Sequence, residues 1–170
     1  MSNIGSSGKA SGGELEERID LTAETEAKLE QSATLAKNGQ LKEALALLAA
    51  LEKRCRVGND TPSLVKVVEA SVQYCYDMKD YETLIITLQT LSTRRSQKTQ
   101  AIRALVQKAI PWCIVGDYTP VPTTNEADEA SRDKLVVALR DISDGKIFLE
   151  GERARLTRAL ATIKVRWCSG

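Results

Sequence analysis

Apolar residues recur along this chain at intervals of three and four positions rather than at every second position. The clearest run covers residues 41–55, and its apolar members are Leu41, Ala44, Leu45, Leu48, Leu51 and Cys55. This spacing places them on one face of an α-helix, whereas a half-buried strand would alternate. Stripes of the same kind continue towards the end of the chain, so the pattern predicts an all-α protein.

Polar breaks divide this pattern into about seven helices. Five breaks lie at residues 38–39, 58–60, 79–80, 116–125 and 144–145, and a sixth lies between the apolar stripe that ends at Leu91 and the helix expected from residue 96. Glycine or asparagine in most of them supplies the left-handed conformation with which helices commonly end. The first helix and the last three are expected at about 22–37, 96–115, 126–143 and 147–166.

Prolines refine two of these boundaries. Thr61 is expected to cap the third helix, with Pro62 at its first helical position. Pro111 lies inside the fifth expected helix and should kink it or end it early, because proline lacks the amide proton that a helix interior needs.

The second and fourth helices repeat one another. Shifting the sequence by 40 positions places residues 39–45 over residues 79–85. The same shift superposes three apolar pairs, namely Leu45 on Ile85, Leu48 on Leu88 and Leu51 on Leu91. A period of this length is typical of stacked helix pairs that share one core. We therefore expect a right-handed, tetratricopeptide-like helical-repeat solenoid of about seven antiparallel helices.

Composition narrows the function. The chain has 170 residues, no histidine, four cysteines and a formal net charge of +1. Without histidine a Ser-His-Asp or Cys-His site is impossible, and the cysteines lack the paired spacing of a zinc site. The charge gives no general attraction to nucleic acid or membranes, and no apolar run approaches the ~18 residues that span a bilayer. We expect no enzyme activity, no cofactor or metal, and neither nucleic-acid nor membrane binding.

Two sequence blocks resemble a known family. Residues 91–97 (LSTRRSQ) form the first, and residues 145–150 (GKIFLE), 152–157 (ERARLT) and 160–164 (LATIK) form the second. Together they resemble the N-terminal part of the non-ATPase regulatory subunit 12 family, PCI-domain subunits of the 26S proteasome lid. The resemblance covers about residues 27–164, and its two Arg-containing blocks are the specific part.

The resemblance implies a function and a setting. Members of the family carry an arc of helical repeats followed by a PCI module, and they are scaffold and assembly subunits rather than proteases. It implies other lid and base subunits, and possibly the core particle, as partners in ubiquitin-dependent degradation in the cytoplasm and nucleus. Two alternatives stay open: a free-standing helical-repeat adaptor that binds peptides, and a subunit of a signalosome-type PCI complex.

The domain organisation follows from these observations. Residues 1–13 are rich in glycine and serine without an apolar block, so they are not a secretory signal, and we expect a disordered tail over residues 1–21. Residues 22–164 are expected to form the helical-repeat domain. Residues 165–170 depart from the family pattern, and no PCI module follows them, so we interpret the chain as a truncated product of an alternative transcript or gene model.

One candidate partner-binding segment is basic. No acidic residue lies between Glu82 and Asp117, whereas the segment contains Arg94, Arg95, Lys98, Arg103 and Lys108. It is either a docking face for an acidic protein surface or a solvated helix end, where cations are favoured. RNA is the weaker partner, because no aromatic residues alternate with the cations to stack on bases.

The last expected helix supplies the other candidates. Glu152 and Arg155 are three residues apart and can pair along the helix. Arg153 and Arg155 can instead bond to carbonyls and carboxylates of the preceding repeat. The apolar stripe includes Leu156, Leu160 and Ile163, for which a solenoid expects a following helix. Since none follows, we predict uncovered apolar surface here that binds a partner or a second copy.

Overall fold

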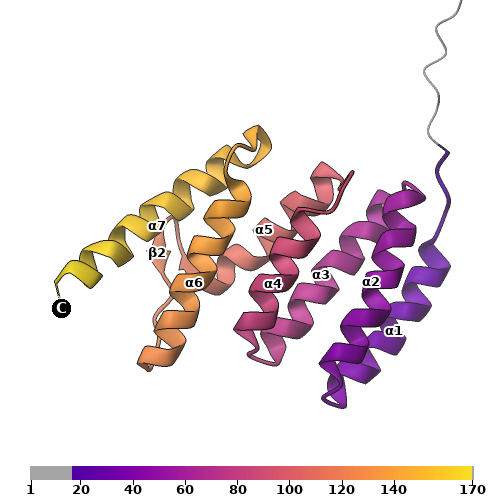
Figure 1. Cartoon of the computed structure of the whole chain (residues 1–170), viewed down its shortest axis with the longest axis horizontal. Coiled ribbons are helices and arrows are strands. Elements are labelled where there is room, and N and C mark those ends of the chain that lie inside the picture. The colour runs from indigo at the N-terminus through magenta and orange to yellow at the C-terminus, as the bar shows by residue number, and fades with distance from the viewer. Residues whose placement is uncertain (1–16, 170) are drawn as a thin grey trace, which may run out of the picture.

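The computed structural model describes residues 17–169, and this part of the chain is built from α-helices with one very small sheet (Figure 1). The helices are α1 (Thr22–Lys37), α2 (Leu41–Val57), α3 (Thr61–Asp77), α4 (Tyr81–Ser92), α5 (Thr99–Cys113), α6 (Glu126–Ser143) and α7 (Glu150–Cys168). A 3₁₀ turn, η1 (Ile147–Leu149), precedes α7, and strands β1 (Ile114–Val115) and β2 (Thr119–Pro120) follow α5. The all-α prediction and the expected helix number are confirmed.

The helices form two layers. One layer contains α1, α3 and α5, and α3 packs against both of the others. The second layer contains α2, α4 and α6. In it α4 packs against α6, while α2 packs across to α1 and α3 of the first layer. Figure 1 shows α2, α4 and α6 on the near side and the two ends of the helical array far apart. The buried apolar residues of the helices form a single cluster that extends from Leu21 to Ile163. The predicted stripes therefore face one another across a continuous core.

Three turns confirm the repeat. Gly39, Asn59 and Lys79 lie twenty residues apart, and each has a positive φ, of 77°, 56° and 53°. In each turn the amide of the following residue donates to the carbonyl five residues earlier. The distance from nitrogen to oxygen is 2.9 Å for Gln40, 3.0 Å for Asp60 and 3.1 Å for Asp80. This is the Schellman pattern of helix ends. One helix and its turn occupy twenty residues, so a helix pair has the predicted period of 40.

The start of α3 differs from the prediction. Asp60 rather than Thr61 is the N-cap, and Pro62 therefore occupies the second helical position. The Asp60 carboxylate accepts hydrogen bonds from the Ser63 amide (3.3 Å) and hydroxyl (2.8 Å). A carboxylate on the residue after the left-handed turn reaches the free amides directly, and Asp80 repeats this arrangement with Thr83 at the start of α4.

The fifth helix and the following loop also differ. Ser96 has a φ of 60° and Lys98 is extended, so α5 begins at Thr99 instead of residue 96. Pro111 lies inside α5, which ends two residues later at Cys113. The segment expected to be only a loop contains the β1–β2 hairpin, in which Ile114 pairs with Pro120.

Asp60 also holds the segment before α1. Its Oδ2 accepts a hydrogen bond from the Leu21 amide (2.8 Å), and the Ile19 amide donates to the Gly58 carbonyl (2.8 Å). Leu21 is buried in the core cluster. Residues 17–21, placed in a disordered tail by the sequence, thus lie against the α2–α3 turn, while residues 1–16 of that predicted tail lie outside the described residues.

No α-helix within residues 17–169 combines the length and apolar content needed to cross a bilayer.

The Asp60 contacts make stability depend on pH. Burial raises the pKa of Asp60, but hydrogen bonds from Leu21 and Ser63 outweigh it and leave the pKa below its usual value. A lowered pKa stabilises the fold above the unfolded value of about 3.9 and loses that effect as the pH falls through the folded value. Both Asp60 oxygens accept hydrogen bonds, and an amide offers only one uncharged acceptor, so we expect Asp60→Asn to lower the free energy of unfolding by about 1–2 kcal/mol at pH 7, with the difference shrinking below pH ~4.

Urea unfolding followed by circular dichroism between pH 7 and pH 2.5 measures this difference. Asp77→Asn, at an exposed position of the same helix, is the control and should unfold like the unaltered chain at every pH. A loss for Asp60→Asn that is independent of pH would show that the carboxylate is not ionised at the cap.

Candidate interaction surfaces

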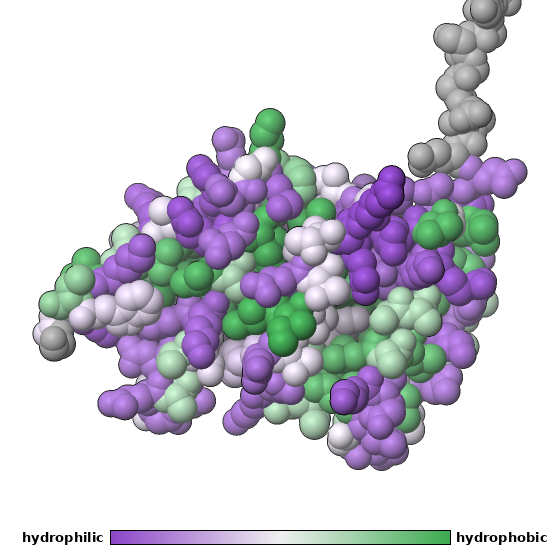
Figure 2. All heavy atoms as spheres, in the orientation of Figure 1, coloured by the Kyte–Doolittle hydropathy of each residue, from purple (hydrophilic) through white to green (hydrophobic). Residues whose placement is uncertain are grey.

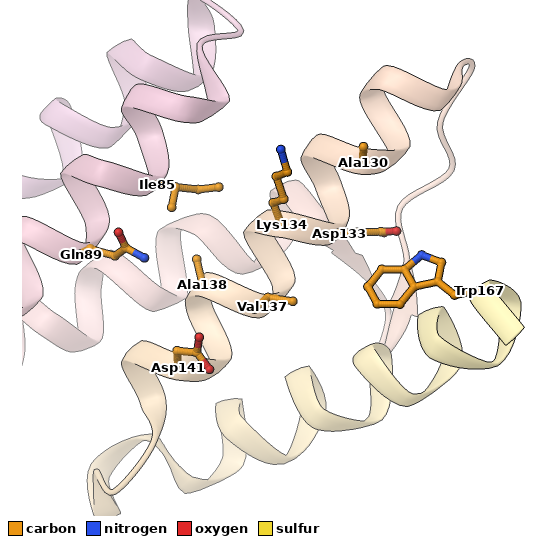
Figure 3. Close-up of a pocket in the computed structure, with 9 residues that line it drawn as sticks. All are labelled: Ile85, Gln89, Ala130, Asp133, Lys134, Val137, Ala138, Asp141 and Trp167. Atoms are coloured by element: carbon orange, nitrogen blue, oxygen red, sulfur yellow. The ribbon is translucent and has the colours of Figure 1, made fainter.

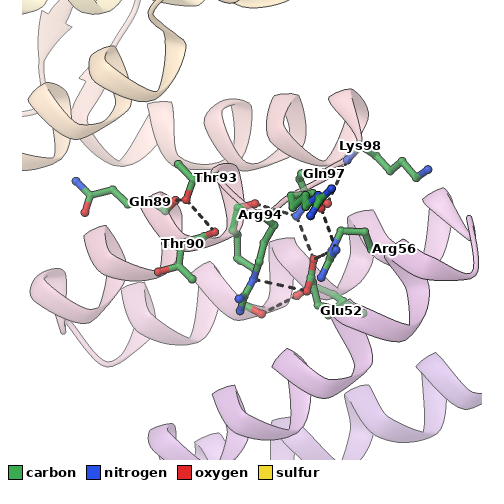
Figure 4. A network of polar contacts seen from close by, with 12 residues as sticks. Glu52, Arg56, Gln89, Thr90, Thr93, Arg94, Gln97 and Lys98 are labelled. Atoms are coloured by element: carbon green, nitrogen blue, oxygen red, sulfur yellow. Dashed lines mark hydrogen bonds and ion pairs between the residues drawn. The ribbon is translucent and has the colours of Figure 1, made fainter.

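The predicted basic segment begins in the loop between α4 and α5, where a buried carboxylate organises it (Figure 4). Glu52 of α2 has a side chain that is 1% exposed. Its Oε1 accepts hydrogen bonds from Arg56 Nε (2.9 Å) and Gln97 Nε2 (3.1 Å). Its Oε2 lies 3.9 Å from Arg94 Nε and has no hydrogen-bond partner in the described part of the chain. Glu52 thus joins the end of α2 to the α4–α5 loop.

Further contacts fix the same loop. Arg56 Nη1 donates to the Arg95 carbonyl (3.0 Å), and Lys98 Nζ donates to Asn59 Oδ1 (2.6 Å). The Arg95 residue is exposed, and the Arg94 side chain is 39% exposed. The loop therefore presents Arg94 and Arg95 outwards, while Lys98 serves partly as an internal tie.

The sequence analysis missed Glu52. A signal was present, because Glu52 lies four residues after Leu48 and three before Cys55, on the buried face of α2. A charged residue on an apolar stripe is buried with partners or it does not stay charged. Its position therefore marks a polar network inside the core, although the sequence does not give its partners.

Arg103 lies apart from this loop, on α5. Its guanidinium sits over the Phe148 ring, 5.6 Å from the centroid. It also lines a hollow between α3 and α5, together with Val65, Glu69 and Lys108. The basic segment is thus split between two places rather than forming one continuous patch.

Arg153 and Arg155 bond to earlier parts of the chain. Arg153 donates to the Asp144 carboxylate (2.9 Å). Arg155 donates to the carbonyls of Asp117 and Gly116, and both distances are 2.9 Å. These contacts agree with the alternative of bonds to carbonyls and carboxylates. The fork of Arg155 fastens α7 to the hairpin turn that follows α5.

The predicted apolar stripe of α7 is buried. Leu156, Leu160 and Ile163 belong to the core cluster, and α7 packs against α6 and β2. These three side chains hold α7 in place and are not on the surface of the described chain. The exposed apolar residues near this end are Ile147 (85% exposed), Val165 and Trp167 (56% exposed). Self-association through this end stays a prediction.

Hollows lie on the face formed by α2, α4 and α6, where hydrophobic side chains interrupt the hydrophilic surface (Figure 2). One of them, about 470 Å³, lies between α4 and α6, with Ile85, Lys134, Val137 and Asp141 along its walls. Trp167 from the end of α7 closes one side of it (Figure 3).

The second hollow is a groove of about 140 Å³ between α2 and α4. The residues that line it are Leu45, Ala49, Ser71, Ile86, Thr87, Thr90, Leu91 and Arg94. Ile86 is 54% exposed there, and Arg94 is the only charged member of the set. This groove is called the Arg94 groove below.

The buried cysteines are poor nucleophiles. Burial raises the pKa of the Cys75 thiol to about 11 and that of Cys113 to about 12. Thiols with such values remain protonated near neutral pH and are unreactive. Within residues 17–169 no group of three or more acidic, cysteine or histidine side chains is arranged to hold a metal ion.

Comparison with known proteins matches the chain to one family model and to several relatives. The family model described as PSMD12/CSN4, N-terminal, matches residues 43–167. The chain is 37% identical over 145 residues to the 26S proteasome non-ATPase regulatory subunit 12 of Dictyostelium discoideum, covering 85% of this chain and 30% of that protein. It is 35% identical over 127 residues to homolog A of that subunit in Arabidopsis thaliana, covering 75% and 26%.

A yeast relative extends the comparison. The 26S proteasome regulatory subunit RPN5 of Saccharomyces cerevisiae is 28% identical over 121 residues, which cover 71% of this chain and 25% of that protein. The chain thus spans between a quarter and a third of the length of these relatives.

The Glu52 network predicts a large effect of one substitution. Glu52→Ala leaves Arg56 without its buried partner and frees the α4–α5 loop, so we expect the free energy of unfolding to fall by about 2–3 kcal/mol. Glu43→Ala, at an exposed position of the same helix, should change it by less than about 0.5 kcal/mol.

Urea unfolding of both variants, with limited proteolysis of residues 93–98, measures this effect. Equal stabilities for the two variants would mean that Glu52 does not hold the loop.

Proposed function

The chain belongs to the PSMD12/CSN4 N-terminal family, and from that membership we propose that it is a non-catalytic scaffold of the 26S proteasome regulatory particle lid. Its role is to supply protein–protein contacts in ubiquitin-dependent degradation. The observation that carries the proposal is the family match over residues 43–167, which includes nearly all of the helical array from α2 to α7.

The structure supports a binding role rather than chemistry. The hollows on the α2–α4–α6 face are shallow and open between helices, as expected for surfaces that bind protein. The relatives are named as regulatory and non-ATPase subunits. The buried thiols of Cys75 and Cys113 are protonated near neutral pH, so they offer no nucleophile.

We propose other lid and base subunits as partners, with the core particle as a further one, in the cytoplasm and the nucleus. The named relatives are 26S proteasome subunits, which favours the proteasome over a signalosome-type complex. The proposed repeat domain is residues 22–164. α7 continues to Cys168 and the family model to residue 167, so the departure of residues 165–170 from the family stays a prediction.

Affinity purification tests the scaffold role. The full chain, tagged at its N-terminus and expressed at native levels, should copurify with lid subunits in stoichiometric amounts, as measured by quantitative mass spectrometry. The helical content of the tagged chain is checked by circular dichroism.

Recovery of the chain without proteasome subunits would contradict the proposal. Recovery of many unrelated proteins in small amounts would instead favour the free-standing adaptor.

A further inference from the structure

The Arg94 groove combines three features. Its walls are aliphatic or small, its one charge is a cation, and that cation has spare hydrogen-bonding capacity. The α4–α6 hollow, by contrast, carries Asp133, Lys134 and Asp141. The charge of the Arg94 groove is therefore of one sign, and it defines the chemistry of an occupant.

Arg94 is held in place but not satisfied. Its Nε lies 3.9 Å from Glu52 Oε2, which is too long for a hydrogen bond. The guanidinium makes no hydrogen bond within the described residues, and a guanidinium offers five donors. The buried carboxylate thus orients Arg94 by attraction while the donors stay free, and 39% exposure leaves them accessible from the groove.

The floor and walls accept an apolar side chain. Leu45 and Ala49 line the groove from α2, and Ile86, Thr87 and Thr90 line it from α4. A volume of about 140 Å³ is of the order of one aliphatic side chain. Leaving Ile86 54% exposed is unfavourable, because each Å² of apolar surface removed from water is worth about 25 cal/mol.

We propose that the Arg94 groove is a docking site for an acidic amphipathic helix of a partner protein. An aliphatic side chain of that helix enters the groove between α2 and α4. A carboxylate one helical turn away bonds to the Arg94 guanidinium, with Arg95 adding to the positive field. This is the helix-in-groove mode of recognition, with a charge-assisted contact that sets the register. The proposal refines the scaffold function and rests on it for the identity of the partner.

The two terminal helices, α1 and α7, do not offer such a surface. The exposed acidic residues of α1 include Glu26 and Glu30, but the exposed apolar positions beside them are alanines such as Ala23 and Ala27. The exposed face of α7 is basic, with Arg153, Arg158 and Lys164. Neither α1 nor α7 of a second copy therefore pairs a carboxylate with a large aliphatic side chain. The helix α4 does so, through Glu82 and Ile86, and Ile86 itself lines the groove, so self-association is the alternative that the test must exclude.

Selection from a library tests the proposal without the proteasome. Helical peptides with randomised surface positions are displayed on phage and selected against the full chain. We expect enriched peptides to carry Asp or Glu one turn from Leu, Ile or Met. Synthetic versions measured by fluorescence anisotropy should bind about tenfold more weakly to Arg94→Gln, as expected for losing a charge-assisted hydrogen bond.

Matched variants separate the groove from general electrostatics. Ala49→Trp fills the groove and should abolish binding. Ala50→Trp and Arg95→Gln alter exposed neighbours that do not line the groove, and should change binding by less than about threefold. Thermal melting of every variant confirms that it folds, and Ala49→Trp decides the matter should Arg94→Gln be unstable.

Several results would overturn the proposal. These are no enrichment over background, enriched peptides without a carboxylate, or equal losses for Arg94→Gln and Arg95→Gln. Binding of an RNA oligonucleotide that depends on Arg94 would show that the occupant is nucleic acid. Self-association that is lost in Ala49→Trp would show that the occupant is a second copy of the chain. If the chain binds the peptides but does not copurify with lid subunits, the proposed scaffold function is wrong and the proposed docking site stands.

Discussion

The whole structure depends on the coverage of each apolar stripe by neighbouring helices. Leu64, Leu84 and Leu105, on three different helices, are fully buried, and all three belong to one cluster. Burying one such side chain is worth about 1.5–3 kcal/mol. No helix pair can bury both of its sides alone, so the order and spacing of the helices decide the fold. Neighbouring helices of one layer are covered by the other layer on one side only. Shallow grooves therefore remain between them on the outer side.

Polar groups set the register of this stack. The left-handed residues Gly39, Asn59 and Lys79 end three successive helices in the same way, so each new helix starts at an equivalent position. Asp60 then caps α3 and ties the segment before α1 to the same turn. Glu52 likewise joins the end of α2 to the α4–α5 loop through its hydrogen bonds. The carboxylates of Asp60 and Glu52 are thus structural, and the one at Glu52 also attracts Arg94, whose Nε lies 3.9 Å away.

The sequence was sufficient for local features that recur and insufficient for contacts between distant residues. Helix α6 was predicted at its observed bounds, because an asparagine cap and an Asp-Gly break flank a clear stripe. The N-cap at Asp60 was missed since Thr61 and Pro62 offered an equally good local pattern one residue later. The partners of Glu52 were out of reach, because Gln97 lies 45 residues away along the chain. Likewise, the stripe of α7 was recognised, but its complete burial depends on α6 and the β1–β2 hairpin.

The described helices differ in how many sides their neighbours cover, and this gives the most direct test of the account. α3 is packed among α1, α2, α4 and α5, whereas α7 packs against α6 and the hairpin on one side. Native-state hydrogen exchange, resolved helix by helix in the full chain, measures local stability. The account predicts the slowest exchange in α3 and α5 and faster exchange in α1 and α7. Protection of α1 and α7 equal to that of α3, or rapid exchange throughout α3, would contradict it.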